Sequence, residues 1–85
     1  MKHSASASFW SAYEALPEDV RRLADRCYAL LKENSSHPSL RFKPVGRYWS
    51  VRVGLHYRAL GVSAESGVVW FWIGTHAQYD KLIGT

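Results

Sequence analysis

The stretch that decides the fold runs from residue 48 to residue 62 and reads Tyr-Trp-Ser-Val-Arg-Val-Gly-Leu-His-Tyr-Arg-Ala-Leu-Gly-Val. Its first part alternates apolar and more polar residues, which is typical of a strand with one buried face. The connection Gly54-Leu55 is too short for a crossover between parallel strands. We therefore predict that residues 48–53 and 56–62 are two strands paired as an antiparallel hairpin.

Two further stretches, on either side of this hairpin, have the composition of strands. Residues 39–45 and 68–73 are rich in β-branched and aromatic residues, and Gly46 and segment 65–67 mark the turns between strands. Four consecutive strands joined by tight turns predict an antiparallel meander. In the last strand, strict alternation predicts two opposite faces, one formed by Val69, Phe71 and Ile73 and the other by Val68, Trp70 and Trp72.

The amino-terminal part of the chain has helical periodicity instead. Apolar residues recur at helical spacing within residues 9–16, and Pro17 then interrupts the pattern. Glu18 and Asp19 favour the start of a second helix, because acidic groups are stabilised near the positive end of the helix dipole. The apolar stripe of this second helix continues to residue 34, shortly before Pro38.

The carboxyl-terminal segment, residues 76–83, predicts a short helix with Thr75 as its N-cap. Helices first and strands afterwards indicate the α+β class. The predicted architecture is two N-terminal helices packed on one face of an antiparallel β-meander, followed by a short C-terminal helix. His3 lies in a terminus that we expect to fray.

Length and composition fit one globular domain over residues 1–85, with 47% apolar and 21% charged residues. No stretch approaches the roughly 18 apolar residues of a membrane span, and the first residues lack the apolar segment of a secretory signal. We therefore expect a soluble, cytoplasmic protein. A single cysteine, Cys27, excludes an intramolecular disulfide and a cysteine-based zinc cage.

The net charge of +4 arises entirely in the second half of the chain. Between Glu33 and Glu65 there is no carboxylate, although the same stretch contains several cationic residues and two histidines. The basic residues there are Arg41, Lys43, Arg47, Arg52 and Arg58, and the histidines are His37 and His56. Such a one-sided charge distribution favours a polyanionic ligand, an acidic protein partner, or both.

Alternation in the central hairpin predicts that Arg52 and Arg58 lie close together on the polar face of the sheet, near Tyr48 and His56. Arginine forks bind phosphate and aromatic rings stack on unpaired bases, so this face suits nucleic acid. The simpler interpretation is that the arginines only solubilise the sheet and that the tryptophans belong to the core. No metal-binding, nucleotide-binding or serine-nucleophile signature is present.

Three stretches together resemble the RelE/ParE superfamily of toxins from bacterial toxin–antitoxin modules: residues 37–43, residues 48–60 and residues 69–82. The strand ending in His-Tyr-Arg-Ala-Leu and the terminal Ile-Gly-Thr-His-Ala-Gln-Tyr-Asp-Lys-Leu are the most specific parts. The resemblance covers nearly the whole chain and implies two helices on a curved antiparallel sheet. The first strand usual in the family is reduced here to residues 2–8.

The resemblance also implies roles for individual residues. Arg58 matches the sheet arginine that contacts the scissile phosphate, and His76 matches the histidine of the histidine-using nuclease members. The catalytic set implied is His76, Arg58, Arg52 and Tyr79. Arg41 and Lys43 match basic positions of the family's RNA groove, and together with Arg47 and His56 from the carboxylate-free stretch they form the predicted RNA-binding set.

The function implied is that of a toxin that acts as a ribosome-associated endoribonuclease, needs neither metal nor other cofactor, cleaves messenger RNA and inhibits translation. His76 would serve as general acid or base, since histidine titrates near neutrality. Two alternatives are a ParE-like toxin that inhibits DNA gyrase without nuclease activity and a non-toxic nucleic-acid-binding module. The expected partners are messenger RNA on the ribosome and a cognate antitoxin that covers the basic face in a hetero-oligomer, with no membrane involved.

Overall fold

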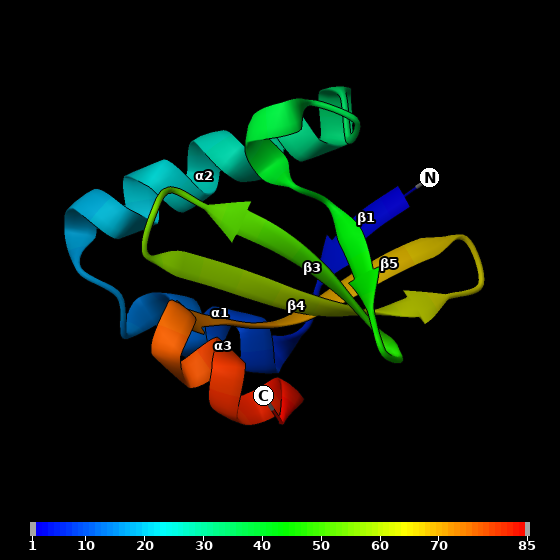
Figure 1. Cartoon of the computed structure of the whole chain (residues 1–85). Helices are drawn as coiled ribbons and strands as arrows, with labels where there is room; N and C mark the ends of the chain where they lie inside the picture. The colour runs from blue at the N-terminus through cyan, green and yellow to red at the C-terminus, as the bar shows by residue number, and fades with distance from the viewer. Residues whose placement is uncertain (1, 85) are drawn as a thin grey trace.

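The structure, a computed structural model, describes residues 2–84 (Figure 1). The elements, in chain order, are β1 (Lys2–Ala5), α1 (Ala7–Glu14), α2 (Glu18–Glu33), the short 3₁₀ helix η1 (Pro38–Leu40), β2 (Lys43–Val45), β3 (Tyr48–Val53), β4 (Tyr57–Ala64), β5 (Gly67–Thr75) and α3 (His76–Ile83). The α+β class is confirmed, as are both N-terminal helices and the short C-terminal helix.

The five strands form one sheet in the order β1-β5-β4-β3-β2. Strands β2 to β5 pair antiparallel, which confirms the predicted meander. β1 adds to the outer edge of β5 in parallel, so the whole sheet is mixed. The prediction that His3 lies in a frayed terminus is therefore wrong, because His3 pairs with Val68 inside this edge strand.

Two strands begin later than predicted, and β4 and β5 extend further than predicted, to Ala64 and over Gly67–Thr75. The stretch 39–45 is a strand only from Lys43 onward, because Pro38 begins a 3₁₀ turn and Arg41 adopts a left-handed backbone with φ 46°. His56 lies in the turn between β3 and β4, and the second strand of the hairpin begins at Tyr57.

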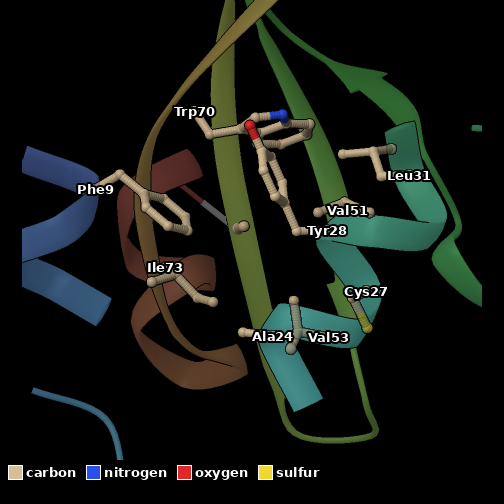
Figure 2. A pocket seen from close by; sticks show the side chains of 10 residues that line it. Phe9, Ala24, Cys27, Tyr28, Leu31, Val51, Val53, Trp70 and Ile73 are labelled. Carbon is tan, nitrogen blue, oxygen red and sulfur yellow. The ribbon is translucent and has the colours of Figure 1, made fainter. Parts of the chain in front are cut away.

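The main core lies between the sheet and the helices α1 and α2, as Figure 2 shows for the side chains beneath α2. Trp70 is 1% exposed and Leu31 3% exposed, and Val51 and Val53 of β3 face the same cluster. Cys27 is half-buried on the apolar stripe of α2, and burial raises the pKa of its thiol. The helices thus cover one face of the sheet, which leaves the opposite face, here called the outer face, for the site.

The strict alternation predicted for β5 is wrong because this strand contains a β-bulge. The register pairs Gly61 with Trp70 and Leu60 with Trp72, so Phe71 is an extra residue on β5. Trp70 and Ile73 both belong to the core, whereas Phe71 contacts Tyr48 on the outer face. The backbone oxygen of Phe71 accepts a hydrogen bond from the Ser8 hydroxyl at 2.9 Å, which links the bulge to α1.

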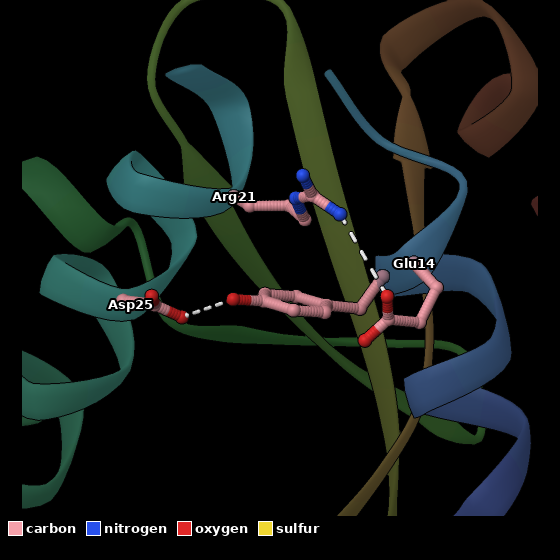
Figure 3. A network of polar contacts seen from close by, with 4 residues as sticks. Glu14, Arg21 and Asp25 are labelled. Atoms are coloured by element: carbon pink, nitrogen blue, oxygen red, sulfur yellow. Dashed lines mark hydrogen bonds and ion pairs between the residues drawn. The ribbon is translucent and has the colours of Figure 1, made fainter. Parts of the chain in front are cut away.

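The two N-terminal helices are also joined by polar contacts (Figure 3). The Tyr13 hydroxyl donates to Asp25 Oδ1 at 2.8 Å, and Arg21 lies 3.7 Å from a carboxylate oxygen of Glu14. The bond to Asp25 raises the pKa of the Tyr13 phenol. These contacts are exposed, so their contribution to stability is small.

His3 holds β1 against the core through its side chain. Its Nδ1 accepts a hydrogen bond from the Trp70 indole N–H at 3.1 Å, and its ring stacks on Trp70 with the centroids 6.0 Å apart. The backbone oxygen of His3 accepts from the Tyr28 hydroxyl at 3.0 Å. Burial lowers the pKa of His3, because the charged imidazolium is disfavoured there.

Acid is therefore expected to destabilise the fold through His3. Its folded-state pKa is lowered, so its contribution is fully present above the ordinary histidine pKa of about 6.5 and is lost as the pH falls through the folded value. Protonation at Nδ1 would also replace the acceptor for Trp70 by a second donor. Urea unfolding between pH 5 and pH 8 measures this, and a His3→Gln variant should lose part of the pH dependence. If the free energy of unfolding of His3→Gln depends on pH as strongly as that of wild type, His3 is not the group responsible.

Candidate active site on the outer face

Helix α3 returns across the outer face and packs against β4 and β5 (Figure 1). Its start is fixed by a capping box: the Thr75 hydroxyl accepts from the Gln78 N–H at 3.2 Å, and the Gln78 side chain accepts from the Thr75 N–H at 3.0 Å. The prediction of Thr75 as N-cap is confirmed. Tyr79, one turn into the helix, is only 5% exposed and points at the sheet.

Arg58, on β4, lies directly beneath this helix. Its guanidinium carbon is 5.4 Å from the centroid of the Tyr79 ring, a cation–π contact. Two of its nitrogens, Nε and Nη1, are buried and have no hydrogen-bond partner within residues 2–84. Buried donors are nearly always paired, so these two nitrogens make Arg58 a candidate partner for an acceptor from outside the described residues.

Arg52 lies opposite Arg58 in the register of the central hairpin, as alternation predicts. Its Nε donates to the backbone oxygen of Gly54 at 2.9 Å, which holds the side chain near the end of β3. Like charges placed directly opposite each other destabilise a sheet. An anion bound between the two guanidinium groups would remove that repulsion.

Ser50 is a further polar residue of this face, and reasoning from the sequence did not single it out. It is completely buried, and its hydroxyl has no partner among the described residues. It pairs with Leu60, two residues beyond Arg58 on β4. The signal in the sequence was only a serine on the same face as Arg52, which does not distinguish a buried hydroxyl from an exposed one.

His76 is the first residue of α3, and its side chain is exposed. Its Nδ1 lies 3.3 Å from a carboxylate oxygen of Asp80, one turn later, and its ring centroid is 5.7 Å from that of Tyr79. Its backbone N–H donates to the backbone oxygen of His56 at 2.8 Å. Tyr79 thus contacts both His76 and Arg58, so three of the four predicted catalytic residues lie together at one end of the outer face, and Arg52 is related to them only through its register with Arg58.

The predicted RNA-binding residues are spread more widely. His56 is exposed in the turn beside His76, whereas Arg41 is exposed at the end of η1. Lys43 pairs with Ser50 and so shares its outer face at the β2 edge, and Arg47 lies in the turn between β2 and β3 at the other end of the sheet. These residues border the site and do not form one cluster with Arg58.

Within residues 2–84, no group of three His, Cys, Asp or Glu side chains is placed to hold a metal ion. No helix in this range is long and apolar enough to cross a membrane.

Comparison with solved structures defines the class of fold. A chain of the RelB–RelE antitoxin–toxin complex from Methanococcus jannaschii superimposes with a TM-score of 0.71 at 13% identity, covering 93% of this chain and 96% of that chain. The isolated RelE toxin of E. coli gives 0.62 at 10% identity, with 96% and 94% covered. A copper-bound mutant toxin from Helicobacter pylori gives 0.62 at 11% identity, with 92% and 97% covered. The protein has the fold of RelE toxins.

A family model described as the ParE-like toxin domain matches residues 18–81, from the start of α2 into α3. The chain therefore belongs to the family of ParE-like toxin domains, within the RelE/ParE superfamily, and is a toxin of the toxin–antitoxin kind. A search of curated proteins finds no match.

Proposed function

We propose that the protein is an endoribonuclease that cleaves messenger RNA on the ribosome and thereby stops translation in the cytoplasm. The observation that carries the proposal is the guanidinium of Arg58, whose buried donors lack an acceptor within residues 2–84 at the end of the sheet where His76 lies. A phosphodiester supplies the acceptor oxygens and the negative charge that this arginine lacks. The 2′-hydroxyl beside that phosphate makes RNA, unlike DNA, able to react without an added nucleophile.

The proposed reaction is attack of the 2′-oxygen on the adjacent phosphorus. The O2′–P bond forms, the P–O5′ bond breaks, and the products are a 2′,3′-cyclic phosphate and a 5′-hydroxyl. His76 accepts the proton of the 2′-hydroxyl, the departing 5′-oxygen takes a proton from water, and Asp80 orients the imidazole through Nδ1. Arg58 and Arg52 stabilise the charge that builds on the phosphoryl oxygens.

Tyr79 takes a positioning role in this scheme. Its buried ring lies against both the Arg58 guanidinium and the His76 imidazole, so it sets the distance between them. A cation–π contact of a desolvated arginine contributes about 1–2 kcal/mol, enough to hold the guanidinium in one orientation before the phosphate binds.

The second candidate function is inhibition of DNA gyrase without RNA cleavage. The match to the ParE-like toxin domain favours it, because the same basic outer face could bind a protein target instead of RNA. The two functions differ in what is damaged first. We expect expression without an antitoxin to deplete messenger RNA while DNA supercoiling stays normal at early times. Intact messages with accumulating gyrase-linked DNA breaks would show that the second candidate is correct.

We further propose that a cognate antitoxin covers the outer face with an acidic segment. The stretch from Asn34 to Ala64 has no carboxylate, so its arginines and lysine lack partners of opposite charge nearby in the sequence. Binding should weaken steeply as salt rises, since exposed charge pairs are screened over about 10 Å at 0.1 M. Titration calorimetry in increasing salt measures this. An affinity that does not change with salt would contradict the proposal. So would an antitoxin that protects only the exposed sides of α1 and α2.

A further inference from the structure

The part of the outer face not covered by α3 carries two aromatic rings in contact. Tyr48 of β3 and Phe71 of β5 have ring centroids 5.6 Å apart and ring planes inclined at 53°. Both side chains are half-buried, and the neighbouring Val62 of β4 is 36% exposed. We call Tyr48 and Phe71 the aromatic platform. In Figure 1, α3 lies below the end of the sheet where β3 turns into β4, and the β4–β5 hairpin extends well beyond it.

The bulge in β5 places two consecutive aromatic residues, Phe71 and Trp72, on the outer face. Without the extra residue, alternation would place Trp70 and Trp72 on one face and Phe71 on the other. With it, Phe71 contacts Tyr48 on the outer face, Trp72 pairs with Leu60 on that face, and Trp70 stays in the core. Bulges are frequent beside functional sites because they redirect a side chain. Counted from Trp70 in the core, alternation already places Phe71 on the outer face, and the bulge adds Trp72 beside it.

The charges around the platform have one sign along β2 and β3. Arg47 directly precedes Tyr48, and Lys43 pairs with Ser50 one row further along the same face. Both are exposed. Neither β2 nor β3 contains a carboxylate, and Glu65, in the turn between β4 and β5, is three residues beyond Val62, the partner of Tyr48. Cations beside exposed aromatic rings are the combination that binds single-stranded nucleic acid, whose bases stack while its phosphates contact Lys and Arg.

We infer that the aromatic platform is a stacking subsite for an unpaired RNA base, with Lys43 and Arg47 on the flanking phosphates. The inference rests on the proposed function, because Arg58 holds the scissile phosphate of the same strand. Tyr48 lies four residues from Arg52, the partner of Arg58, so platform and phosphate site are about 13 Å apart at 3.3 Å per residue. Stacked nucleotides rise about 3.4 Å each, so the base held is a few nucleotides from the cut.

A binding cycle with an RNA that cannot be cleaved tests the inference. The ligands are 2′-O-methyl oligonucleotides. One has every base, and each member of a matched series lacks a single base at a different position along the strand. The proteins are wild type, Tyr48→Leu and Phe71→Leu, which keep apolar bulk but lose the flat ring. Trp10→Leu on α1 is the control, since Trp10 is 47% exposed on an element away from the outer face.

We expect each platform variant to bind the complete oligonucleotide about 5- to 150-fold more weakly, and Trp10→Leu to bind it like wild type. At one position of the strand, removal of the base should weaken binding to wild type by a similar factor. The same removal should weaken binding to the platform variants little further. Phe71→Trp should retain affinity. Equal losses from base removal in wild type and platform variants would overturn the inference, as would platform variants that bind normally or an outer face that binds acidic peptide but no oligonucleotide.

The cycle separates this inference from the proposed function because its ligands have no free 2′-hydroxyl. A protein that shows the base-dependent coupling but cuts no RNA would keep the stacking subsite and lose the nuclease. A protein that cuts RNA without the coupling would keep the nuclease and lose the subsite. Thermal unfolding of each variant identifies any loss of affinity that comes from a damaged sheet. If a leucine variant is damaged in this way, the affinity of Phe71→Trp, which keeps an aromatic ring, decides whether the platform stacks on a base.

Discussion

Replacement of Arg58 by methionine is expected to reduce RNA cleavage by about 10²–10³-fold, the usual effect of removing one donor that stabilises charge in a transition state. Methionine keeps the apolar stem beneath Tyr79 and removes all the guanidinium donors. Stability should not fall with activity. A buried donor without an acceptor costs about 1–3 kcal/mol, which offsets the loss of the cation–π contact.

Single-turnover cleavage and thermal unfolding, measured on the same preparations, check both halves of this expectation. Arg26→Met is the matched control, because Arg26 is exposed on α2 and belongs to the helix layer. A large drop in the unfolding temperature of Arg58→Met with parallel loss of activity would mean that Arg58 stabilises the fold. It would then have no demonstrated role toward phosphate.

Replacement of His76 by alanine should lower the cleavage rate by about 10²–10⁴-fold if its imidazole moves the proton of the 2′-hydroxyl. The fold should survive, since the side chain is exposed and the helix start is fixed by Thr75 and Gln78. His76→Gln should be as inactive as His76→Ala, because an amide keeps the polar contact but cannot transfer the proton. Both variants should also lose the part of the pH dependence of the rate that arises from proton transfer by this side chain.

The double variant of His76 and Arg58 adds a test of whether they act together. Residues that act as one unit on one phosphate give losses that are less than additive. A His76→Gln protein that cuts at nearly the wild-type rate, with the same pH profile, would remove His76 from proton transfer. Arg52 and Arg58 would then remain as the charged groups of the site.

Local sequence patterns predicted most of the elements. Alternation located β3, and the short connection after it required a hairpin, so the opposition of Arg52 and Arg58 followed from register alone. Thr75 was a recognisable cap because its hydroxyl acts within one helical turn. In each case the decisive interaction joins residues that are close in the sequence, so a local pattern is enough to predict it.

Features that depend on distant contacts could not be predicted in this way. The parallel pairing of β1 joins His3 to Val68, and the hydrogen bond from Trp70 gives the terminal strand its anchor. The bulge at Phe71 breaks the two-residue period that the prediction assumed. The site also depends on distant contacts. Tyr79 is buried against Arg58 because α3 packs on the sheet at that place, and no local pattern predicts this packing.

The most direct test of the account is cleavage of a defined messenger RNA on programmed ribosomes by the purified protein. Two messages are compared, one with ribose throughout and one with 2′-deoxyribose at the nucleotide before the cut. We predict cleavage of the first message to fragments that end in a 2′,3′-cyclic phosphate, and an intact bond at the substituted position of the second. Equal cleavage of both messages would contradict the 2′-hydroxyl mechanism, and two intact messages from a protein that still arrests growth would contradict the nuclease itself.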